Sequence, residues 1–362
     1  MSAPTGLSIV IPSWNGRALL DRFLPTVLHS AAAFEAACRQ PTEIIVADDA
    51  STDDTLEWLA TRHPQVRLEA AEDHRGFGPT ANRGVAAARY PWVYLLNNDV
   101  ALAPASLVPL ADHWADPQVF AVASSVYDFA SGVLRGAGQI GEFRRGFLGI
   151  HHRYFTLRDQ PEGFIPEARG TSHAARPWLT LYAGGGSSLF HREKFLTLGG
   201  FDDLLAPFGW EDVELSLRAW KQGYEVRYEP ASAVWHQFSS TIPARFDLRR
   251  VGAIYERNRL LTHWLHLDTR AEFAAHGLFV LLKLLASILI GRWEVWRAAA
   301  QALSRLGAVE ARRQQLLAGQ QRALREVLGR VAGELRRPEV RPLTAETAPV
   351  RAYPGQQAGQ AR

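Results

Sequence analysis

The first hundred residues alternate between two hydrophobic patterns. Short runs that are apolar at almost every position are separated by longer segments in which apolar residues recur every three or four positions. The first pattern is typical of strands buried on both faces, and the second of amphipathic helices. The predicted strands are "LSIVIP" (7–12), "EIIVADD" (43–49), "VRLEAA" (66–71) and "WVYLLNND" (92–99), and the predicted helices are 17–39, 51–63 and 78–90. This alternation predicts βαβ units and a Rossmann-like, doubly wound, mostly parallel α/β sheet.

The pattern weakens beyond residue 100. Residues 126–180 are rich in glycine, arginine, histidine and aromatic residues without clear periodicity, so irregular hairpins and loops are expected there. A predicted strand then enters Gly184, Gly185 and Gly186, which either let the backbone approach a ligand or permit a tight bend. The remaining predicted elements are a helix over 191–199, an amphipathic helix over 211–222 and a strand over 225–230.

Polar and turn-forming residues stand where the first, second and fourth strands end. They are Pro12-Ser13-Trp14-Asn15, Asp48-Asp49 and Asn97-Asn98-Asp99. In a doubly wound sheet the carboxyl ends of the parallel strands meet at one edge, where ligands bind. Asn-Asn-Asp by itself is equally expected to form a turn. The acidic pair at a neighbouring strand end favours a ligand crevice.

The polar residues at these strand ends, together with two later residues, suit chemistry on a nucleotide. Asp99 and His236 offer one oxygen and one nitrogen, which suits Mn²⁺ or Mg²⁺ when a diphosphate supplies the other ligands. Such an ion stabilises the charge on a departing phosphate. Asp48 can accept hydrogen bonds from a base or ribose, Trp14 can stack on a flat base, and Asp212 can act as a general base. These parts together describe a nucleotide-sugar transferase.

Each of these residues also has a purely structural interpretation. Trp14 can be core packing, and His236 can be a buried histidine whose hydrogen bonds are satisfied. Glu211 and Asp212 can simply cap their helix, because carboxylates are favoured at a helix N-terminus. The first strand is not followed by G-x-G-x-x-G, and the chain has no G-x-x-x-x-G-K-[ST], so dinucleotide dehydrogenases and P-loop enzymes are disfavoured.

Several motifs in order resemble those of one protein family. They are "IVIPSWNG", "IIVADDASTDDT", "HRGFGPTANRGVAAA", "YLLNNDV", "GGFDDLLAPFGWEDVELSLRAWKQGY" and "VWHQFSST". In this order they resemble the family 2 inverting glycosyltransferases, which have the GT-A fold. The resemblance covers about residues 6–265. "YERNRLLTHW" (255–264) resembles a segment frequent in the rhamnosyltransferase-like subgroup.

The resemblance implies a role for each matching residue. The implied nucleotide-sugar-binding residues are Pro12, Trp14, Asp48, Asn82, Asn98, Gly185 and Gly186; the implied metal ligands are Asp99 and His236; the implied catalytic residues are Asp212, as base, and Glu211 beside it. The implied reaction is a single displacement with inversion, assisted by Mn²⁺ or Mg²⁺. One departure matters: Asn97 replaces the first acid of the family's D-x-D motif, which leaves the metal preference open.

The composition indicates a cellular compartment and shows that charge is unevenly distributed along the chain. The single cysteine, Cys38, excludes an intramolecular disulfide and suits a reducing cytoplasm. The N-terminus has no basic segment before its short apolar run, so a strand is expected there and not a signal peptide. The net charge of the chain is +3, whereas residues 291–341 alone have 11 arginines, no lysine and five glutamates. A basic arm on a nearly neutral body suggests an anionic partner surface.

The C-terminal third predicts a separate helical arm. Residues 272–297 form an apolar stretch interrupted by Lys283, with Trp293 and Trp296 among arginines at its end. Aromatic residues and arginines at the end of an apolar helix suit a helix lying in a membrane interface. Packing on the catalytic domain or on a second subunit is the open alternative. The expected organisation is a catalytic domain over 1–265, a basic helical arm over 266–337 and a disordered tail over 338–362.

The sequence thus favours a cytoplasmic glycosyltransferase, peripheral on the inner face of the cell membrane, in surface polysaccharide synthesis. The family-level expectation is a dTDP-rhamnose or UDP-hexose donor and a glycan or polyprenyl-diphosphate-linked acceptor. Two alternatives stay open: a sugar nucleotidyltransferase, and a non-catalytic nucleotide-binding or scaffold protein with the same fold. Nucleic-acid binding is not expected, because the arginines of the arm lie among leucines and tryptophans and match no nucleic-acid module.

Overall fold

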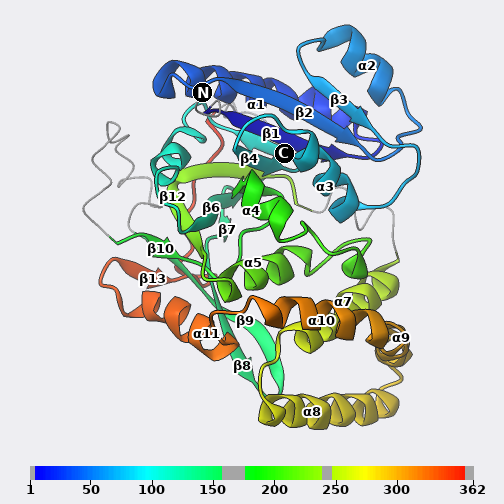
Figure 1. Ribbon diagram of the computed structural model, residues 1–362. Coiled ribbons are helices and arrows are strands. Elements are labelled where there is room, and N and C mark those ends of the chain that lie inside the picture. Colours follow the sequence, from blue (N-terminus) through cyan, green and yellow to red (C-terminus); the bar gives the residue numbers. More distant parts are fainter. Residues whose placement is uncertain (1–4, 157–175, 239–246, 355–362) are drawn as a thin grey trace.

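A mixed β-sheet forms the centre of the computed structural model, which describes residues 5–156, 176–238 and 247–354 (Figure 1). Its strand order is β10-β12-β6-β11-β4-β1-β2-β3, and β5 and β7 pair with β12 and β6. The strands of this sheet are β1 (Leu7–Ser13), β2 (Thr42–Asp48), β3 (Arg67–Ala70), β4 (Trp92–Leu96), β5 (Val100–Leu102), β6 (Val119–Asp128), β7 (Leu134–Gly136), β10 (Trp178–Leu179), β11 (Ser187–His191) and β12 (Glu225–His236).

The N-terminal half confirms the predicted βαβ units. Strands β4, β1, β2 and β3 pair in parallel, and the helices between them are α1 (Arg17–Cys38), α2 (Thr55–Arg62) and α3 (Phe77–Ala87). Strand β1 is buried on both faces: Ile9 and Ile11 pack in the same hydrophobic cluster as α1, and Val10 packs in the cluster that contains α3. This alternation is the period of two expected of a strand covered on both sides.

The fourth strand ends earlier than the sequence predicts. It stops at Leu96. The backbone N–H of the next residue, Asn97, donates to the carbonyl of Gly186, which directly precedes β11. Residues 97–99 form the connection to β5, which pairs antiparallel with the end of β12. In that register His236 lies opposite Val100, so a residue near the end of β12 comes to lie beside Asp99. The two candidate metal ligands are thereby brought together by strand pairing.

The loop-rich middle of the chain contains regular strands as well as turns. Strands β8 (Gly138–Arg144) and β9 (Phe147–Thr156) form an antiparallel hairpin that projects from the body of the protein (Figure 1). The hairpin turns at Arg145 and Gly146, both of which have positive φ. The predicted hairpins are therefore present, although residues 157–175 of this segment lie outside the described part of the chain.

Most helices of the second half lie on one side of the sheet, below it in Figure 1. They are α4 (Arg192–Thr197), α5 (Glu211–Lys221), α7 (Leu248–His266), α8 (Arg270–Leu289), α9 (Trp293–Leu303), α10 (Leu306–Ala318) and α11 (Leu324–Ala332), with short 3-10 helices at Asp203–Leu205 and Gly333–Arg336. A further 3-10 helix, Val108–His113, belongs to the first half and packs against α1 and β12. Helices α9 and α10 pack on α7, and α11 packs against β8 and α5. Most of the predicted arm therefore packs on the body, whereas α8 exposes a long row of leucines.

The tail beyond residue 338 is more ordered than its polar, proline-containing composition predicts. Strand β13 (Val340–Pro342) pairs antiparallel with β9 and buries Val340. Val350 forms a bridge with Val133, and the ring of Tyr353 packs against Trp235. The prediction of disorder is wrong for these residues, because a free strand edge gives a polar segment backbone partners that its own sequence does not reveal. Residues 355–362 lie outside the described part.

Candidate functional site

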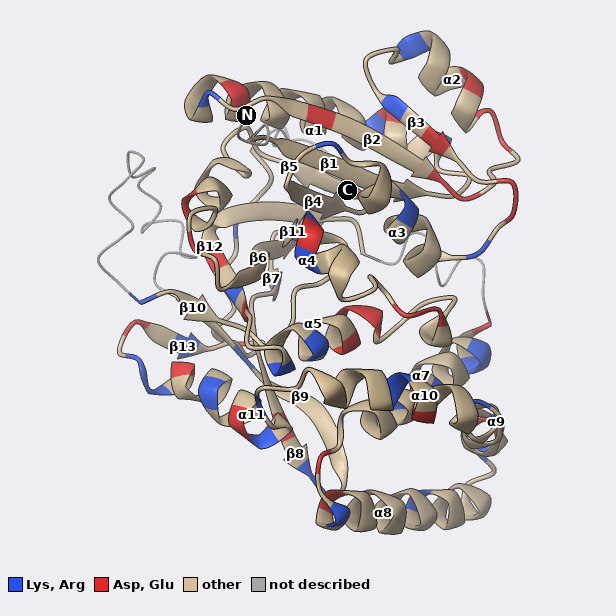
Figure 2. Ribbon diagram, in the orientation of Figure 1, with Lys and Arg blue, Asp and Glu red and all other residues tan. Residues whose placement is uncertain are grey.

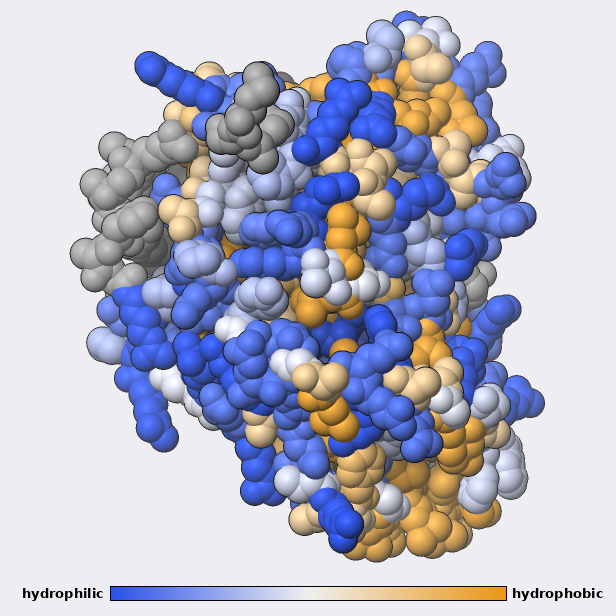
Figure 3. All heavy atoms as spheres, viewed as in Figure 1, coloured by the Kyte–Doolittle hydropathy of each residue, from blue (hydrophilic) through white to orange (hydrophobic). Residues whose placement is uncertain are grey.

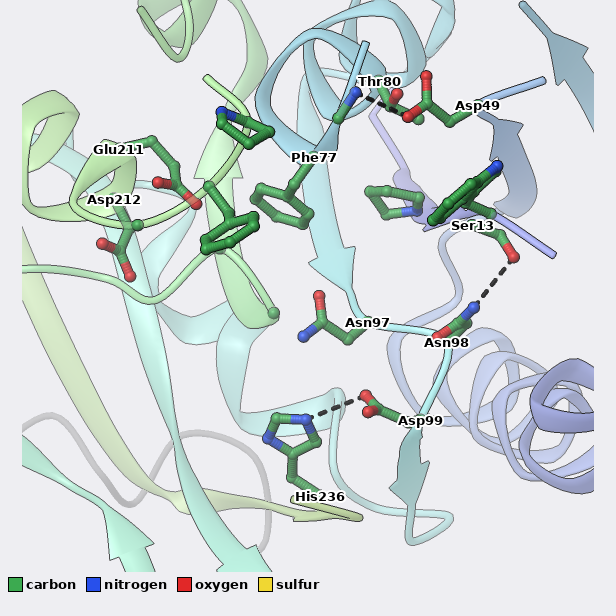
Figure 4. Close-up of a pocket in the computed structure, with 18 of the residues that line it drawn as sticks. Ser13, Asp49, Phe77, Thr80, Asn97, Asn98, Asp99, Glu211, Asp212 and His236 are labelled. Atoms are coloured by element: carbon green, nitrogen blue, oxygen red, sulfur yellow. Dashed lines mark hydrogen bonds and ion pairs between the residues drawn. The ribbon is translucent and has the colours of Figure 1, made fainter. Parts of the chain in front are cut away.

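A cavity of about 600 Å³ opens where β1, β2 and β4 end, and α5 and α7 form its opposite wall (Figure 4). That volume is within the range that holds a nucleotide-sized ligand. The lining residues are Pro12, Ser13, Trp14, Asp49, His74, Gly76, Phe77, Thr80, Asn97, Asn98, Asp99, Gly185, Gly186, Pro207, Phe208, Gly209, Glu211, Asp212, His236, Phe238, Val251 and Tyr255. Nine of the eleven predicted site residues therefore meet at one cavity, and the other two, Asp48 and Asn82, do not.

Asp99 and His236 lie side by side on the wall of this cavity. The Nε2 atom of His236 is 3.0 Å from Oδ1 of Asp99 (Figure 4). The backbone N–H of Gln237 donates to the carbonyl of Asp99 at 2.9 Å, which fixes the end of β12 against the 97–99 turn. Among the described residues no group of three or more His, Cys, Asp or Glu side chains could hold a metal ion. This pair of donors fits a divalent ion only if the substrate or water completes its coordination.

The two asparagines before Asp99 are held in different ways. Asn98 donates from Nδ2 to the Ser13 hydroxyl at 3.0 Å, which joins the ends of β4 and β1. Asn97 lies against Gly186, where an added Cβ would be 2.6 Å from its Nδ2 atom. Gly185 lies as closely against the ring of Phe77, at 2.9 Å from an added Cβ. The glycines therefore let the backbone approach two side chains of the cavity wall, and any larger residue would displace them.

Glu211 and Asp212 occupy the N-terminus of α5, across the cavity from Ser13 and Asp49 (Figure 4). The Oδ1 atom of Asp212 accepts the N–H of Val213 at 2.8 Å. Burial raises the pKa of the Asp212 carboxyl to about 6. Burial, and next the charge of Asp212, raise the pKa of Glu211 to about 8. Burial and mutual repulsion oppose ionisation of both carboxyls at once, so at neutral pH the pair holds one carboxylate that can accept a proton.

A buried ion pair one turn further along fixes the position of α5. Glu214 accepts from Arg218 at 2.9 Å (Nε) and 2.6 Å (Nη2), and its other oxygen is 3.2 Å from Nε2 of His266. Arg218 also donates to the carbonyls of Leu198 and Gly200. The positive charge of Arg218 and the hydrogen bond from His266 outweigh burial and lower the pKa of Glu214 to about 2. Sequence reasoning missed this pair, although the spacing of four residues was available as a signal.

An aromatic stack forms the opposite end of the cavity. The rings of Trp14 and His74 are 4.0 Å apart and inclined by 22°. Nδ1 of His74 lies 2.8 Å from Asp49, which also accepts the backbone N–H groups of Arg75 and Gly76. His74 was not singled out from the sequence. Its place directly after the third strand was the available signal, because strand ends of this sheet converge on the ligand crevice.

Asp48 and Asn82, both predicted to contact the nucleotide sugar, hold protein groups instead. Asp48 is fully buried and accepts the backbone N–H of Ser51 at 2.8 Å as well as its hydroxyl. Its neighbour Asp49 lines the cavity in its place. Asn82 bonds both the N–H and the carbonyl of Phe201, each at 2.8 Å, and so ties α3 to the turn before α5. Neither side chain therefore lines the cavity, because both point toward protein partners, a direction that sequence motifs do not specify.

Comparison with known proteins gives a consistent set of matches. Residues 8–174 match the profile of glycosyl transferase family 2, and residues 92–304 match that of glycosyl transferase family group 2. Over 247 residues the chain is 28% identical to an N-acetylglucosaminyl-diphospho-decaprenol L-rhamnosyltransferase of Mycobacterium tuberculosis, a match covering 64% of this chain and 75% of the relative. It is also 28% identical over 229 residues to the validoxylamine A glucosyltransferase of Streptomyces hygroscopicus, covering 60% and 52%.

The fold is also found among solved structures. A crystal structure of GalNAc-T7 with UDP, GalNAc and Mn²⁺ has a TM-score of 0.53 to this protein at 20% sequence identity. The match covers 74% of this chain and 49% of the other. At that identity the likeness concerns the fold, and the expected arrangement of a mostly parallel sheet with a helical C-terminal region agrees with it.

Proposed function

The chain belongs to the family 2 glycosyltransferases, and from that premise we propose that it transfers a sugar from a nucleoside diphosphate sugar to a hydroxyl of a lipid-linked saccharide, with inversion. The observation that carries this proposal is one cavity that holds the Asp99–His236 pair on one wall and the Glu211–Asp212 pair on another. The rhamnosyltransferase relative, whose name specifies a diphospho-decaprenol acceptor, supports dTDP-rhamnose as the donor. A UDP-hexose is the second donor compatible with the same cavity.

The donor binds through the strand ends in this proposal. The stacked rings of Trp14 and His74 give a flat aromatic surface suited to a nucleobase. Asp99 and His236 would hold Mn²⁺ or Mg²⁺ together with the diphosphate. When bound, such an ion supplies Lewis-acid stabilisation of the charge on the leaving group. Gly185 and Gly186 let Phe77 and Asn97 pack directly on the backbone of the cavity wall, because an added Cβ would lie 2.9 Å and 2.6 Å from those side chains.

The transfer step needs one proton acceptor. The acceptor hydroxyl oxygen forms a bond to the anomeric carbon while the bond from that carbon to the diphosphate oxygen breaks. The hydroxyl proton moves to Asp212, and the nucleoside diphosphate leaves with the electron pair. Attack from the face opposite the diphosphate inverts the configuration. Burial makes Asp212 a stronger base than an exposed aspartate, whose pKa is about 3.9.

Removing the Asp99 carboxylate tests the donor site. We expect the wild-type chain to bind UDP or dTDP in calorimetric titrations with Mn²⁺, and we expect binding at least about tenfold weaker without the ion. Asp99→Ala should abolish the effect of Mn²⁺, because one of the two protein donors is lost. Asp21→Ala, which changes an exposed carboxylate on α1, is the matched control and should bind as the wild type does.

The outcomes of this titration separate the hypotheses. The nucleotide that binds more tightly identifies the donor class. If neither nucleotide binds with or without metal, the transferase proposal loses its support, and a non-catalytic protein with this fold becomes the better explanation. If Asp99→Ala binds both nucleotides with an unchanged response to Mn²⁺, Asp99 has only a structural role in the turn after β4.

The pH dependence of transfer tests the proposed base. Asp212 must be ionised to accept a proton, and its raised pKa means that it becomes protonated as the pH falls through about 6. We therefore expect kcat/KM to fall about tenfold per pH unit below that value, measured as release of nucleoside diphosphate. A rate that stays constant down to the ordinary range of aspartate would exclude Asp212 as the group that titrates.

A further inference from the structure

Helix α8 presents an unpacked apolar face to solvent. In a soluble protein the apolar stripe of a helix normally faces the core, whereas here leucines at helical spacing face outward and Leu289 is 87% exposed. We call this face, together with the start of α9, the apolar strip; its members are Leu278, Leu281, Leu282, Leu285, Ile288, Leu289, Ile290, Trp293 and Trp296. Figure 3 shows the hydrophobic atoms gathered at this end of the molecule. A contiguous patch of this kind marks an interaction surface.

Arg270 is exposed at the start of α8, whereas the charged and titratable residues that follow it in this helix face the body of the protein. Lys283 donates to Glu256 of α7 at 2.6 Å. Glu272 is buried and caps the first turn, and its carboxylate also accepts from Arg325. His276 is buried and its Nδ1 is 2.7 Å from the carbonyl of Gly146 at the tip of the β8–β9 hairpin. The outward side from Ala271 to Gly291 therefore has no charged side chain.

Basic residues stand at both ends of the apolar strip. Arg144 and Arg145 are exposed at the hairpin tip, where Gly146 packs against the backbone of α8. Arg292 and Arg297 are exposed at the other end, beside Trp293 and Trp296. Figure 2 shows Lys and Arg positions in blue on the β8–β9 hairpin and on α9. Cations that flank an apolar face complement a lipid surface with anionic headgroups, and exposed tryptophans prefer the headgroup level. We propose that the apolar strip docks this protein onto an anionic lipid bilayer, with α8 lying in its surface.

The contacts made by the inner side of α8 indicate that this helix lies along the bilayer and does not cross it. By length and composition alone, this 20-residue helix, whose most apolar 18-residue window has a mean hydropathy of 1.7, could cross a membrane. However, the Lys283–Glu256 ion pair and the His276 hydrogen bond fix one side of the helix to α7 and to the hairpin. Hydrocarbon offers no replacement for these polar partners. Only the outer half of the helix can therefore enter the lipid.

Helix α7 connects the apolar strip to the cavity. Val251 and Tyr255 of α7 line the cavity, and the next residue, Glu256, pairs with Lys283 of α8. Docking through the strip would thus hold the cavity at a fixed position relative to the lipid surface. An acceptor with a lipid tail could then reach Asp212 without leaving the bilayer, a consequence that rests on the proposed function, whereas docking itself does not.

Vesicle co-sedimentation of the full chain, without donor or acceptor, tests this proposal. We expect binding to phosphatidylcholine vesicles that contain phosphatidylglycerol, and weaker binding to phosphatidylcholine alone. The double variant Leu285→Glu/Leu289→Glu should bind at least about tenfold more weakly, since it places two carboxylates in the apolar face. Leu196→Glu, an exposed leucine on α4, is the matched control and should bind as the wild type does. Arg144→Glu/Arg145→Glu should remove most of the preference for anionic lipid.

Other outcomes would overturn the proposal. Absence of vesicle binding, combined with a dimer in sedimentation velocity that Leu285→Glu/Leu289→Glu dissociates, would assign the apolar strip to a second copy of this chain. Resistance of the bound protein to alkaline carbonate would indicate a spanning helix. Equal vesicle binding by the double variant would exclude the strip as the contact. Nucleotide titration of each variant separates these results from misfolding and from failure of the proposed transferase activity.

Discussion

Replacing Asp212 with asparagine is expected to lower the turnover number of sugar transfer by about 10² to 10⁴, the range typical of a lost general base. Asparagine keeps the shape of the side chain but cannot take the proton of the acceptor hydroxyl. The affinity for the donor nucleotide should stay unchanged, because Asp212 lies across the cavity from the Trp14–His74 stack. Steady-state release of nucleoside diphosphate, together with calorimetric nucleotide binding, measures the two quantities separately.

Glu211→Gln is the informative companion variant. Glu211 is protonated at neutral pH because burial and the charge of Asp212 raise its pKa to about 8, so glutamine resembles the form already present. We expect a turnover number within a few-fold of the wild type. The pH below which kcat/KM falls should stay near 6. Equal losses for Glu211→Gln and Asp212→Asn would instead indicate that the two carboxyls act as one unit, and a loss for Glu211→Gln alone would assign the base to Glu211.

Breaking the buried Glu214–Arg218 pair is expected to have the largest effect on stability. Glu214→Gln leaves the Arg218 guanidinium charged and fully buried without its counter-ion, which typically costs about 3–5 kcal/mol in the free energy of unfolding. Denaturant unfolding followed by tryptophan fluorescence at neutral pH measures the loss. Asp21→Asn, which removes the exposed pair of the same spacing with Arg17, should cost less than about 1 kcal/mol.

The same pair predicts how stability changes with acid. The folded protein holds the pKa of Glu214 at about 2, below its ordinary value of 4.5. The stabilisation is therefore complete above about pH 4.5 and is lost as the pH falls towards 2. Glu214→Gln should flatten this part of the stability curve. A wild-type curve with the same slope as the variant would mean that Glu214 is not paired in solution.

The alternation of strands and helices in the first hundred residues was sufficient to predict the parallel sheet. Runs such as "IIVAD" are apolar at nearly every position because both faces of the strand are covered, and helical spacing separates them. The motif residues at the strand ends were predictable for the same reason, since parallel strands must end at a common edge. Pro12, Trp14 and Asp99 accordingly line one cavity.

The sequence could not predict which of two neighbouring residues reaches the cavity. Asp48 and Asp49 are adjacent and chemically identical, yet only Asp49 reaches the cavity, because successive side chains at a strand end point in different directions. Asn82 likewise bonds the backbone of Phe201, a partner defined only when α3 packs beside the 200–201 turn. The strand at 340–342 in the C-terminal tail likewise depends on a distant partner, the free edge of β9.

The sequence by itself determined the sheet, the cluster of polar residues at its edge and the family to which the chain belongs. These follow from local periodicity and from motifs that read continuously along the chain. The sequence also paired His236 with Asp99, but the tertiary structure alone decided how they meet, through the pairing of β5 with β12, and that the leucines of α8 face outward. Both depend on contacts between distant segments, such as Lys283 with Glu256, and local patterns cannot specify which side of an apolar helix finds a protein partner.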